Sequence, residues 1–447
     1  MAMQLTLQVY WDFQWHDVGN VVFREPESGL QGAPNFSYHV AYILKALERA
    51  GNLEKEDLAN QMAIGLNLPC SFSRDYMGGE IAPVLRDIIP QGAARRQWVS
   101  LLGYRRDPGQ RIDTQLLSLG CVAPIGNVRI KEAADLFESN RRKSSPISFE
   151  RADISILVDD TLAYMHKEPH LIAGALCAGG DAPKLLLVET CDGRYALEGI
   201  VPDAEVVKHW LVKLPRGRKS KSDIEVLEGE AAIYRLLTER GLNSISDAFL
   251  DSSGGVVSLW LPRFDRVSTA EGVVRHGVES VYSLMGQIGD GARLSHVDVL
   301  TKLRACVTYP AEWDELLVDY LVRDILNTAV GNRDNHGRNI ALLKRNFEIE
   351  LAPAYDIAPM ILDPEGIASS TLWPIRFLNH QRNPDYREIL TQYADHPESA
   401  ALCMIRTLDK LVDLKEGLRK HGAPATMLNH PAIRMREPER VLEEFSR

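Results

Sequence analysis

The stretch Gly-Asn-Arg-Asp-Asn-His-Gly-Arg-Asn at residues 331–339 decides how the rest of the chain is interpreted. Within it, Asp334 is followed five residues later by Asn339. A second carboxylate, Asp356, comes seventeen residues after that asparagine, in Leu-Ala-Pro-Ala-Tyr-Asp. Kinase-type phosphoryl transfer uses one carboxylate that faces the attacking hydroxyl, and an amide and a second carboxylate that hold magnesium. The spacing therefore predicts a phosphoryl-transfer site.

Asp334 is the candidate catalytic base, and Asn339 and Asp356 are candidate ligands of Mg²⁺, which prefers hard oxygen donors. Taken alone, an Asp and an Asn at this spacing are more simply explained as part of a polar turn, in which their side chains satisfy backbone groups. The functional interpretation is favoured because a hairpin predicted between Asn339 and Asp356 returns the second carboxylate to the loop. His336 lies between Asp334 and Asn339, and it suits either a ligand or phosphate contact or a structural bond to a carbonyl.

Local patterns predict strands in the first part of the chain and helices in the second. Strands are predicted at 4–10, 11–22, 185–188, 209–213 and 256–261. Helices are predicted at 38–50, 225–240, 313–330 and 398–420, and the stretch 90–98 is predicted to lead into another helix. Gly241 and Gly331 are placed to end two of them. Two further strands, 340–343 and 347–351, are predicted to form a tight hairpin, and the polar stretch 140–151 is predicted to be a linker or exposed loop.

Lys213 ends the apolar run 209–213. A lysine there suits a point charge held over nucleotide phosphates, which kinases fix with a helix glutamate. Among the glutamates of the following helix, Glu230 is the best placed. Taken alone, Lys213 is more simply a surface lysine at a strand end, and its spacing to Glu230 and to the downstream motif favours the phosphate role.

Two further motifs lie in the β-rich region. Gly179 and Gly180, followed by Pro and Lys184, form a loop whose amides can approach phosphate, although an ordinary hairpin turn has the same composition. The Walker pattern is absent. Leu-Pro-Arg-Phe-Asp-Arg at 261–266 closes this region, where a two-lobed kinase places the hinge that pairs with adenine. The basic run 216–221 is either a solvated loop or a contact for phosphate or an acidic partner.

Composition limits the class of protein. The chain has 447 residues, 45% of them hydrophobic, which allows two or three globular domains. A net charge of −10 argues against binding nucleic acid by overall charge. The six cysteines form no CxxC pair or zinc spacing, and no run approaches the roughly 20 apolar residues that cross a bilayer. We therefore expect a soluble cytoplasmic protein that does not enter a membrane.

These motifs resemble those of the HipA-type toxin serine/threonine kinases. Residues 332–339 resemble the family's N-x-D-x-H-x-K-N catalytic loop, and 351–356 its L-x-P-x-Y-D metal motif. Residues 179–184 are similar to its Gly-Gly-x-x-Pro-Lys loop and 261–266 to its R-F-D-R hinge. Residues 17–19 and 87–96 resemble its N-terminal subdomain. The motifs follow the family's order over most of the chain.

The resemblance implies an α+β, two-lobed protein-kinase-like fold. Its parts would be an extra N-terminal subdomain (1–135), a β-rich nucleotide-binding lobe (150–265) and a helical catalytic lobe (266–447). It implies ATP and Mg²⁺ as cofactors. The implied catalytic residues are Asp334, Asn339 and His336, and the implied metal ligands are Asn339 and Asp356. The implied cofactor-binding residues are Lys213, Glu230, Gly179, Gly180, Lys184, Pro262, Arg263, Phe264, Asp265 and Asp356.

The resemblance also implies partners. The substrate would be a serine or threonine of a protein, in some members an aminoacyl-tRNA synthetase. The usual partner is a small DNA-binding antitoxin of the HipB type, so DNA would be contacted only through the antitoxin.

The chain departs from the family pattern at two positions. Arg338 stands where the family usually has lysine, so the charge is kept but a planar fork replaces a point charge. Cys177 stands where the family's phosphate loop often carries an autophosphorylated serine. We therefore predict no self-inactivation by phosphorylation there. Cys177 itself is either a redox-sensitive thiol or simply packed in the protein.

Two other functions are compatible with parts of the sequence. A small-molecule phosphotransferase similar to the aminoglycoside kinases would share the fold, but the Pro-Lys loop and the long N-terminal region favour a protein kinase. A catalytically silent partner-binding protein would have no need for the intact set of Asp334, Asn339, Asp356 and Lys213.

Overall fold

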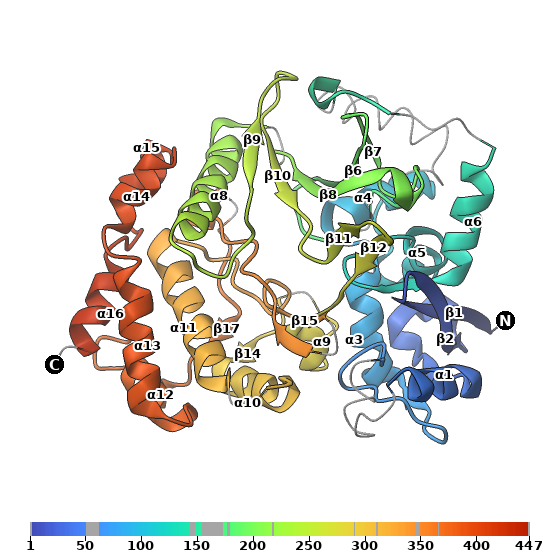
Figure 1. Ribbon diagram of the computed structural model, residues 1–447, viewed down its shortest axis with the longest axis horizontal. Coiled ribbons are helices and arrows are strands. Elements are labelled where there is room, and N and C mark those ends of the chain that lie inside the picture. Colours follow the sequence, from blue (N-terminus) through green and yellow to red (C-terminus); the bar gives the residue numbers. More distant parts are fainter. Residues whose placement is uncertain are drawn as a thin grey trace. The chain divides into compact units, whose positions relative to one another are not determined.

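The computed structural model describes residues 2–50, 62–143, 148–153, 173–176, 179–216, 219–289, 291–309, 312–345, 348–364 and 366–445 (Figure 1). The chain forms two compact units. The first contains 1–216, 251–288 and 343–347, and the second contains 217–250, 289–342 and 348–447. The helix after Lys213 therefore groups with the helical part of the chain and not with the strands that flank it in sequence.

The first unit begins with an antiparallel five-stranded sheet in the order β4-β3-β2-β1-β5. Alternate apolar residues favour a strand at β1: Leu5, Leu7 and Val9 are buried on one face. Leu5 lies opposite the buried Val21 of β2. The strands are β1 (Met3–Trp11), β2 (Gln14–Phe23), β3 (Asn35–Tyr38), β4 (Tyr76–Met77) and β5 (Val128–Ile130). The helices of this region are α1 (Val40–Ala50), α3 (Gly78–Ile88), α4 (Gly92–Leu101), α5 (Asp113–Gly120) and α6 (Lys131–Arg141).

A second sheet of the first unit carries the Gly-Gly loop and Lys213. Strand β8 (Val206–Lys213) lies between β6 (Lys184–Thr190) and β10 (Ser258–Pro262), antiparallel to both, and β7 (Tyr195–Leu197) continues the sheet beyond β6. Because β8 is central, its side chains are largely buried up to its last residue. The unit also contains β11 (Arg266–Thr269), β12 (Gly272–Arg275), β13 (Gly277–Ser280) and α9 (Val281–Leu284). Two strands, β9 (Phe249–Asp251) and β15 (Ala341–Arg345), contain a boundary between the units.

The second unit is mainly helical. Helix α8 (Lys221–Glu239) starts with a capping box in which Ser220 and Asp223 bond each other's backbone N–H. Helix α11 (Trp313–Val330) buries Leu317 and Leu321 and packs against α13 (Pro397–Asp409) and α16 (Glu437–Phe445). Other helices are α10 (His296–Cys306), α12 (Tyr386–Tyr393), α14 (Leu414–Lys420) and α15 (Ala425–Leu428). The strands are β14 (Leu294–Ser295), β16 (Glu348–Leu351) and β17 (Thr371–Leu372).

Most predicted strands and helices are confirmed within a few residues, and β15 and β16 are neighbours in one sheet, as the predicted hairpin requires. Residues 346–347 of its turn and 144–147 of the predicted linker lie outside the described residues. The predicted helix 398–420 is wrong as a single element, since α13 ends at Asp409 and α14 starts at Leu414. Asp413 between them adopts a left-handed φ of 60°, and the fully buried Leu411 anchors the connection. The apolar spacing of residues 398–420, taken as one stretch, does not reveal this turn.

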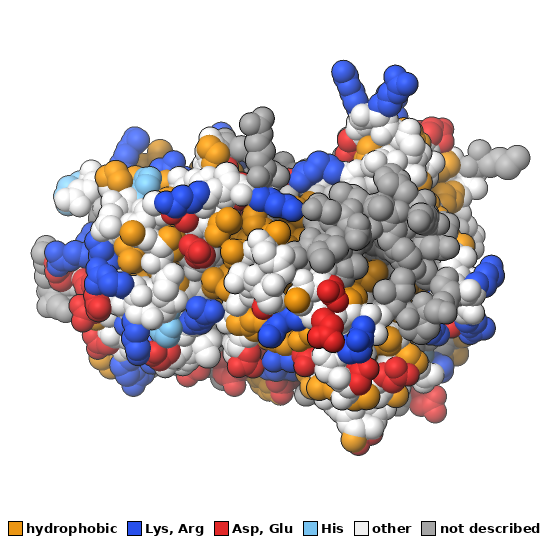
Figure 2. All heavy atoms as spheres, turned by 90° about the horizontal axis from the view of Figure 1, so that it is seen from above, with side chains coloured by type: hydrophobic (Ala, Val, Ile, Leu, Met, Phe, Trp, Pro, Cys, Tyr) orange, Lys and Arg blue, Asp and Glu red, His pale blue; other side chains and the backbone are white. Residues whose placement is uncertain are grey.

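No helix among the described residues is both long and apolar enough to cross a membrane. On the face seen in Figure 2, Lys and Arg side chains alternate with Asp and Glu.

Candidate active site

Helix α11 ends directly before the candidate catalytic loop. Gly331 adopts a left-handed φ of 72°, a conformation that favours glycine, and the chain turns there into residues 332–339. Asn332 is buried, and its side-chain oxygen accepts a hydrogen bond from the backbone N–H of Asp334 at 3.1 Å. Its amide nitrogen donates to the side chain of Asn327 at 2.9 Å. The backbone of Asp334 is therefore held by a side chain that α11 itself orients.

Asp334 and Asn339 are brought together by the loop. The amide nitrogen of Asn339 donates to the backbone oxygen of Asp334 at 2.8 Å. This bond assigns the amide orientation, so that the carbonyl oxygen of Asn339 is the atom that can face a cation. Nε2 of His336 lies 3.5 Å from Oδ1 of Asp334, and its Nδ1 accepts from the backbone N–H of Arg338 at 3.2 Å. His336 thus joins both ends of the loop, which favours a structural role for it.

Asp356 follows β16 and has an unusual backbone. Its φ of 56° lies in the left-handed region, which Asp tolerates better than most residues do. Its N–H donates to the hydroxyl of Tyr234 at 2.6 Å, and its carbonyl accepts from the side-chain amide of Asn332 at 3.2 Å. Asn332 therefore bonds the backbone of both candidate carboxylates, so that the loop and Asp356 form one connected site within the second unit.

Glu230 lies on the buried face of α8, one turn before Tyr234. The hydroxyl of Tyr234 donates to Oε1 of Glu230 at 2.9 Å, and both side chains are buried. Burial and then the neighbouring charges of Glu230 and Asp356 raise the pKa of Tyr234 well above its usual value, so that the hydroxyl keeps its proton. Sequence reasoning missed Tyr234. The available signal was a Glu and a Tyr four residues apart on a predicted helix.

The Gly-Gly loop is held by the N-terminal part of the first unit. The backbone oxygen of Gly180 accepts from the N–H of Ala93 in α4 at 3.0 Å. The carboxylate of Asp181 bonds Arg96 at 2.7 Å and Arg216 at 2.5 Å. Burial opposes ionisation of Asp181, but these two guanidinium groups lower its pKa. The helix α4 thus fixes the loop, and one residue of the predicted basic run takes part.

Lys184 closes the same loop from the strand side, since its Nζ donates to the backbone oxygen of Gly179 at 2.8 Å. Gly180 has a φ of 100°, and a Cβ there would lie 2.3 Å from Nζ of Lys184. The positive φ therefore favours glycine at 180, and a larger residue would also displace the end of the Lys184 side chain. Cys177 lies outside the described residues.

Lys213 is the last residue of β8 and is only 4% exposed. The alternative of a surface lysine is therefore wrong. Burial of an ammonium group is costly, so a lysine at such a position usually serves a charge partner. Lys213 belongs to the first unit, whereas Asp334, Asn339 and Asp356 belong to the second.

The side chains of the predicted hinge motif hold the first unit together. Arg263 and Asp265 are buried and bonded to each other at 2.7 Å, and Arg266 bonds the same carboxylate at 2.6 Å. Both arginines donate to the backbone oxygen of Pro124, and the N–H of Gly126 donates to Asp265 at 2.7 Å. The side chains of Arg263 and Asp265 thus have structural partners, and the N–H of Arg263 donates to the backbone oxygen of His209 at 3.0 Å. An adenine contact at this segment would fall to other backbone groups.

The residues of the loop suit a magnesium nucleotide. Among the described residues, no group of three or more His, Cys, Asp or Glu is arranged to hold a metal ion by itself. Magnesium in nucleotide sites is commonly held by one or two protein oxygens together with phosphates and water. The oriented carbonyl oxygen of Asn339 and the carboxylate of Asp356 would be the protein's share of such a site.

Comparison with known proteins gives the family. The profile of the HipA-like C-terminal domain matches residues 176–413, which is more than half of the chain. No curated protein was found to match the chain in sequence. A similar solved structure is that of a toxin–antitoxin system of HipA, HipB and operator DNA from Shewanella oneidensis MR-1. The match to it covers 99% of this chain and 98% of the matched chain. Its TM-score is 0.64 and its sequence identity 14%.

A second solved structure, the Helicobacter pylori proinflammatory kinase CtkA, covers 60% of this chain and 94% of its own, with 15% identity and a TM-score of 0.37. The full-length match to HipA confirms the predicted fold class, an α+β fold with an N-terminal sheet subdomain and kinase-like lobes. On the match of its family profile and its order of motifs, the chain belongs to the HipA-like family of serine/threonine kinases.

Proposed function

We propose that this protein transfers the γ-phosphoryl group of ATP, with Mg²⁺, to a serine or threonine hydroxyl of another protein, as the toxin of a toxin–antitoxin pair in the cytoplasm. The single observation that carries the catalytic part is the connection of Asp334, Asn339 and Asp356 through the hydrogen bonds of Asn332 and Asn339. A polar turn of purely structural use has no need to hold a second carboxylate, seventeen residues later in sequence, in a left-handed backbone.

The residues divide the work as follows. Asp334 orients the substrate hydroxyl and accepts its proton as the oxygen attacks the γ-phosphorus and the bond to ADP breaks. Asn339 and Asp356 hold the magnesium, which neutralises charge that builds up on the phosphates. Lys213 and the backbone N–H groups of the Gly-Gly loop bind phosphates, while backbone groups at Pro262 and Phe264 meet the adenine.

Support for the toxin role comes from family membership and from the S. oneidensis structure, in which HipA is bound to HipB and operator DNA. We propose that the partner here is a small DNA-binding antitoxin of the same type, and that contact with DNA occurs through it. The net charge of −10 supports a protein that does not itself bind DNA by overall charge.

Phosphoproteomics after induction of the wild type and of Asp334→Ala tests the catalytic proposal. We expect one dominant phosphosite that appears only with the wild type. Asp409→Ala, which removes an exposed carboxylate of α13, should behave as the wild type. Transfer of labelled phosphate to metabolites alone would instead identify a small-molecule phosphotransferase, and the absence of Mg²⁺-dependent ATP binding would identify a silent binding protein.

A further inference from the structure

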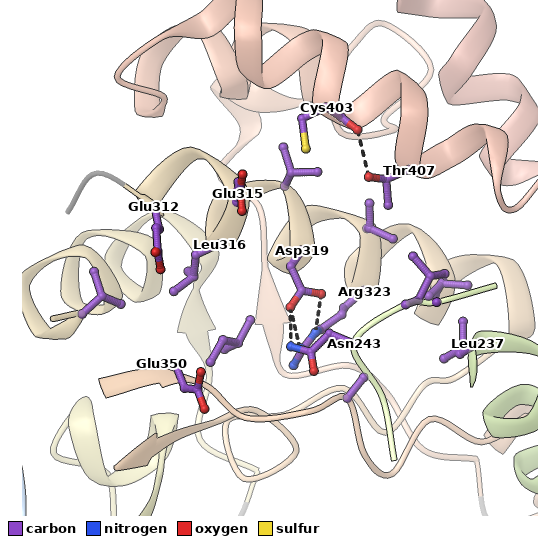
Figure 3. Close-up of a pocket in the computed structure, with 18 of the residues that line it drawn as sticks. Leu237, Asn243, Glu312, Glu315, Leu316, Asp319, Arg323, Glu350, Cys403 and Thr407 are labelled. Atoms are coloured by element: carbon purple, nitrogen blue, oxygen red, sulfur yellow. Dashed lines mark hydrogen bonds and ion pairs between the residues drawn. The ribbon is translucent and has the colours of Figure 1, made fainter. Parts of the chain in front are cut away.

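The second unit contains a pocket that the proposed reaction does not use. Its volume is about 350 Å³, within the range of ligand sites. Its walls come from the C-terminal end of α8, one face of α11, the strand β16 and one face of α13 (Figure 3). The candidate residues of the catalytic loop are not among its described lining residues.

The floor of this pocket is apolar. Helix α11 contributes Leu316, and Val322 and Leu326 four residues apart, and β16 contributes Ile349 and Leu351. The opposite face of α11 is buried in the core of the unit. Val322, Leu326, Ile349 and Leu351 are buried and form the bottom of the pocket, whereas Leu316 is half-buried and lies nearer its mouth.

One charged pair in the pocket is already neutralised. Asp319 receives hydrogen bonds from both Nε and Nη2 of Arg323, at 3.0 and 2.6 Å, and one from the side-chain amide of Asn243 at 3.0 Å (Figure 3). Arg323 also donates to the backbone oxygen of Ala352 at 2.8 Å. This network ties α11 to the segments beside it, and it adds little net charge.

The remaining charges are unbalanced. Glu312 precedes the first residue of α11 and Glu315 lies in its first turn, while Glu348 and Glu350 lie on β16. Lys410 is the one other cation among the described lining residues. Glu312 and Glu315 are exposed. The lining therefore combines an apolar floor with an excess of carboxylates, and a ligand that matches both features has an apolar part with positive charges beside it.

We propose that this pocket is a docking site for a segment of a partner protein in which leucine or isoleucine side chains stand next to lysines or arginines. An extended or helical segment can present apolar and basic side chains next to each other on one face. A small organic cation fits less well, because small-molecule sites enclose most of their ligand, whereas Tyr309, Glu312, Glu315 and Lys410 leave this pocket with an exposed rim.

Fluorescence anisotropy with the full-length protein tests the proposal. The probe is a fluorescently labelled peptide with a central Leu-Ala-Leu segment and three lysines on each side of it. We expect binding that weakens as salt is added, and no binding of peptides in which glutamates replace the lysines or serines replace the leucines. The variant Glu312→Gln/Glu315→Gln should weaken binding about fivefold. The matched control Glu398→Gln/Glu443→Gln removes two exposed carboxylates of the same unit outside the pocket and should leave the affinity unchanged.

Cys403 supplies a second readout, because its thiol lines the pocket and is partly exposed (Figure 3). The bound peptide should slow alkylation of Cys403 by iodoacetamide, while the exposed Cys191 of the first unit reacts at an unchanged rate. Equal affinity of both double variants, or unprotected Cys403 at saturating peptide, would overturn the proposal. So would protection by spermine equal to that by the peptide, since the site would then select a small cation. Neither readout depends on kinase activity.

Discussion

The hydroxyl of Tyr234 on α8 accepts the backbone N–H of Asp356 at 2.6 Å and donates to Glu230 at 2.9 Å. A buried helix side chain thus fixes the backbone of the candidate metal ligand, from a position 122 residues earlier in sequence. Asn332 holds the carbonyl of the same residue from the other side. The left-handed conformation of Asp356 is therefore determined by groups on both sides of it.

Replacement of Tyr234 by phenylalanine tests this relationship. The ring stays packed, but the N–H of Asp356 loses its acceptor, and an unsatisfied buried group costs about 1–3 kcal/mol. We expect a higher Mg²⁺ concentration for half-maximal phosphoryl transfer, with a smaller loss of rate at saturating Mg²⁺. Titration of Mg²⁺ in a kinase assay measures both quantities.

The matched control is Tyr386→Phe, which removes a buried hydroxyl that donates to Asp324 at 2.9 Å in the same unit. It should lower the melting temperature by a similar amount and leave the Mg²⁺ requirement unchanged. Equal effects of the two variants on Mg²⁺ would show that Tyr234 acts only through stability.

Substitutions of Asp334 and of Asp356 should impair different steps, transfer in the first case and Mg²⁺-dependent ATP binding in the second. Asp334→Asn removes the proton acceptor, so transfer should fall by about 10²–10⁴-fold while ATP binding with Mg²⁺ is retained. Asp356→Asn removes a hard anionic ligand, so the Mg²⁺-dependent part of ATP binding should weaken. Calorimetry with and without Mg²⁺, next to single-turnover transfer, separates the two. The same profile for both variants would contradict the assigned roles.

Features that depend on short stretches of sequence could be predicted, whereas side-chain contacts between distant stretches could not. The loop 332–339, its preceding glycine and the β15–β16 hairpin depend on short-range turn chemistry and alternation, so their positions could be predicted. The bond from Tyr234 to Asp356 joins two elements that no local pattern connects. The R-F-D-R motif was interpreted from its place after a strand, whereas the buried partners of Arg263 and Asp265 lie in residues 124–126, far away in sequence.

Stability of the first unit should depend on pH through Asp265. Burial opposes its ionisation, but the charges of Arg263 and Arg266 hold its pKa well below its usual range. A carboxyl with a depressed pKa in the folded state stabilises the fold above its unfolded pKa of about 3.9, and this contribution is lost as the pH falls below that value. We expect the urea midpoint, followed by tryptophan fluorescence, to drop between about pH 4 and pH 2.

Asp265→Asn should flatten this acid dependence and lower stability at neutral pH by about 3–5 kcal/mol, since both arginines lose a buried partner. Glu150→Gln, at an exposed position, serves as the control and should change neither. An unaltered acid slope in Asp265→Asn would assign the slope to other carboxyl groups, among them Glu198, whose pKa is also lowered by His209 and Arg263 against the effect of burial.

Cys177 should prevent self-inactivation at the position where the family often carries a phosphorylated serine. A thiol is not a usual acceptor for such kinases, so we expect no phosphate on the 174–184 peptide after incubation with ATP. Cys177→Ser restores a hydroxyl and should gain phosphate there, provided that Asp334 is intact. Mass spectrometry of both proteins, and of Cys177→Ser/Asp334→Ala, measures this. Phosphate on the wild-type peptide would refute the prediction.

Gly180→Ala should loosen the Gly-Gly loop and weaken ATP binding. The new Cβ would lie 2.3 Å from Nζ of Lys184, so the end of the lysine side chain, which bonds the backbone oxygen of Gly179, must shift. The φ of 100° is also strained for alanine. Gly193→Ala is the matched control, since Gly193 also has a positive φ, 78°, but a Cβ there meets nothing within 4 Å. Both variants should lose about 1 kcal/mol or more of stability through backbone strain. Only Gly180→Ala should also lose ATP affinity by calorimetry, because only that loop is placed to bind phosphate. Unchanged affinity in Gly180→Ala would mean that the loop, although fixed by α4 and Lys184, does not bind the nucleotide.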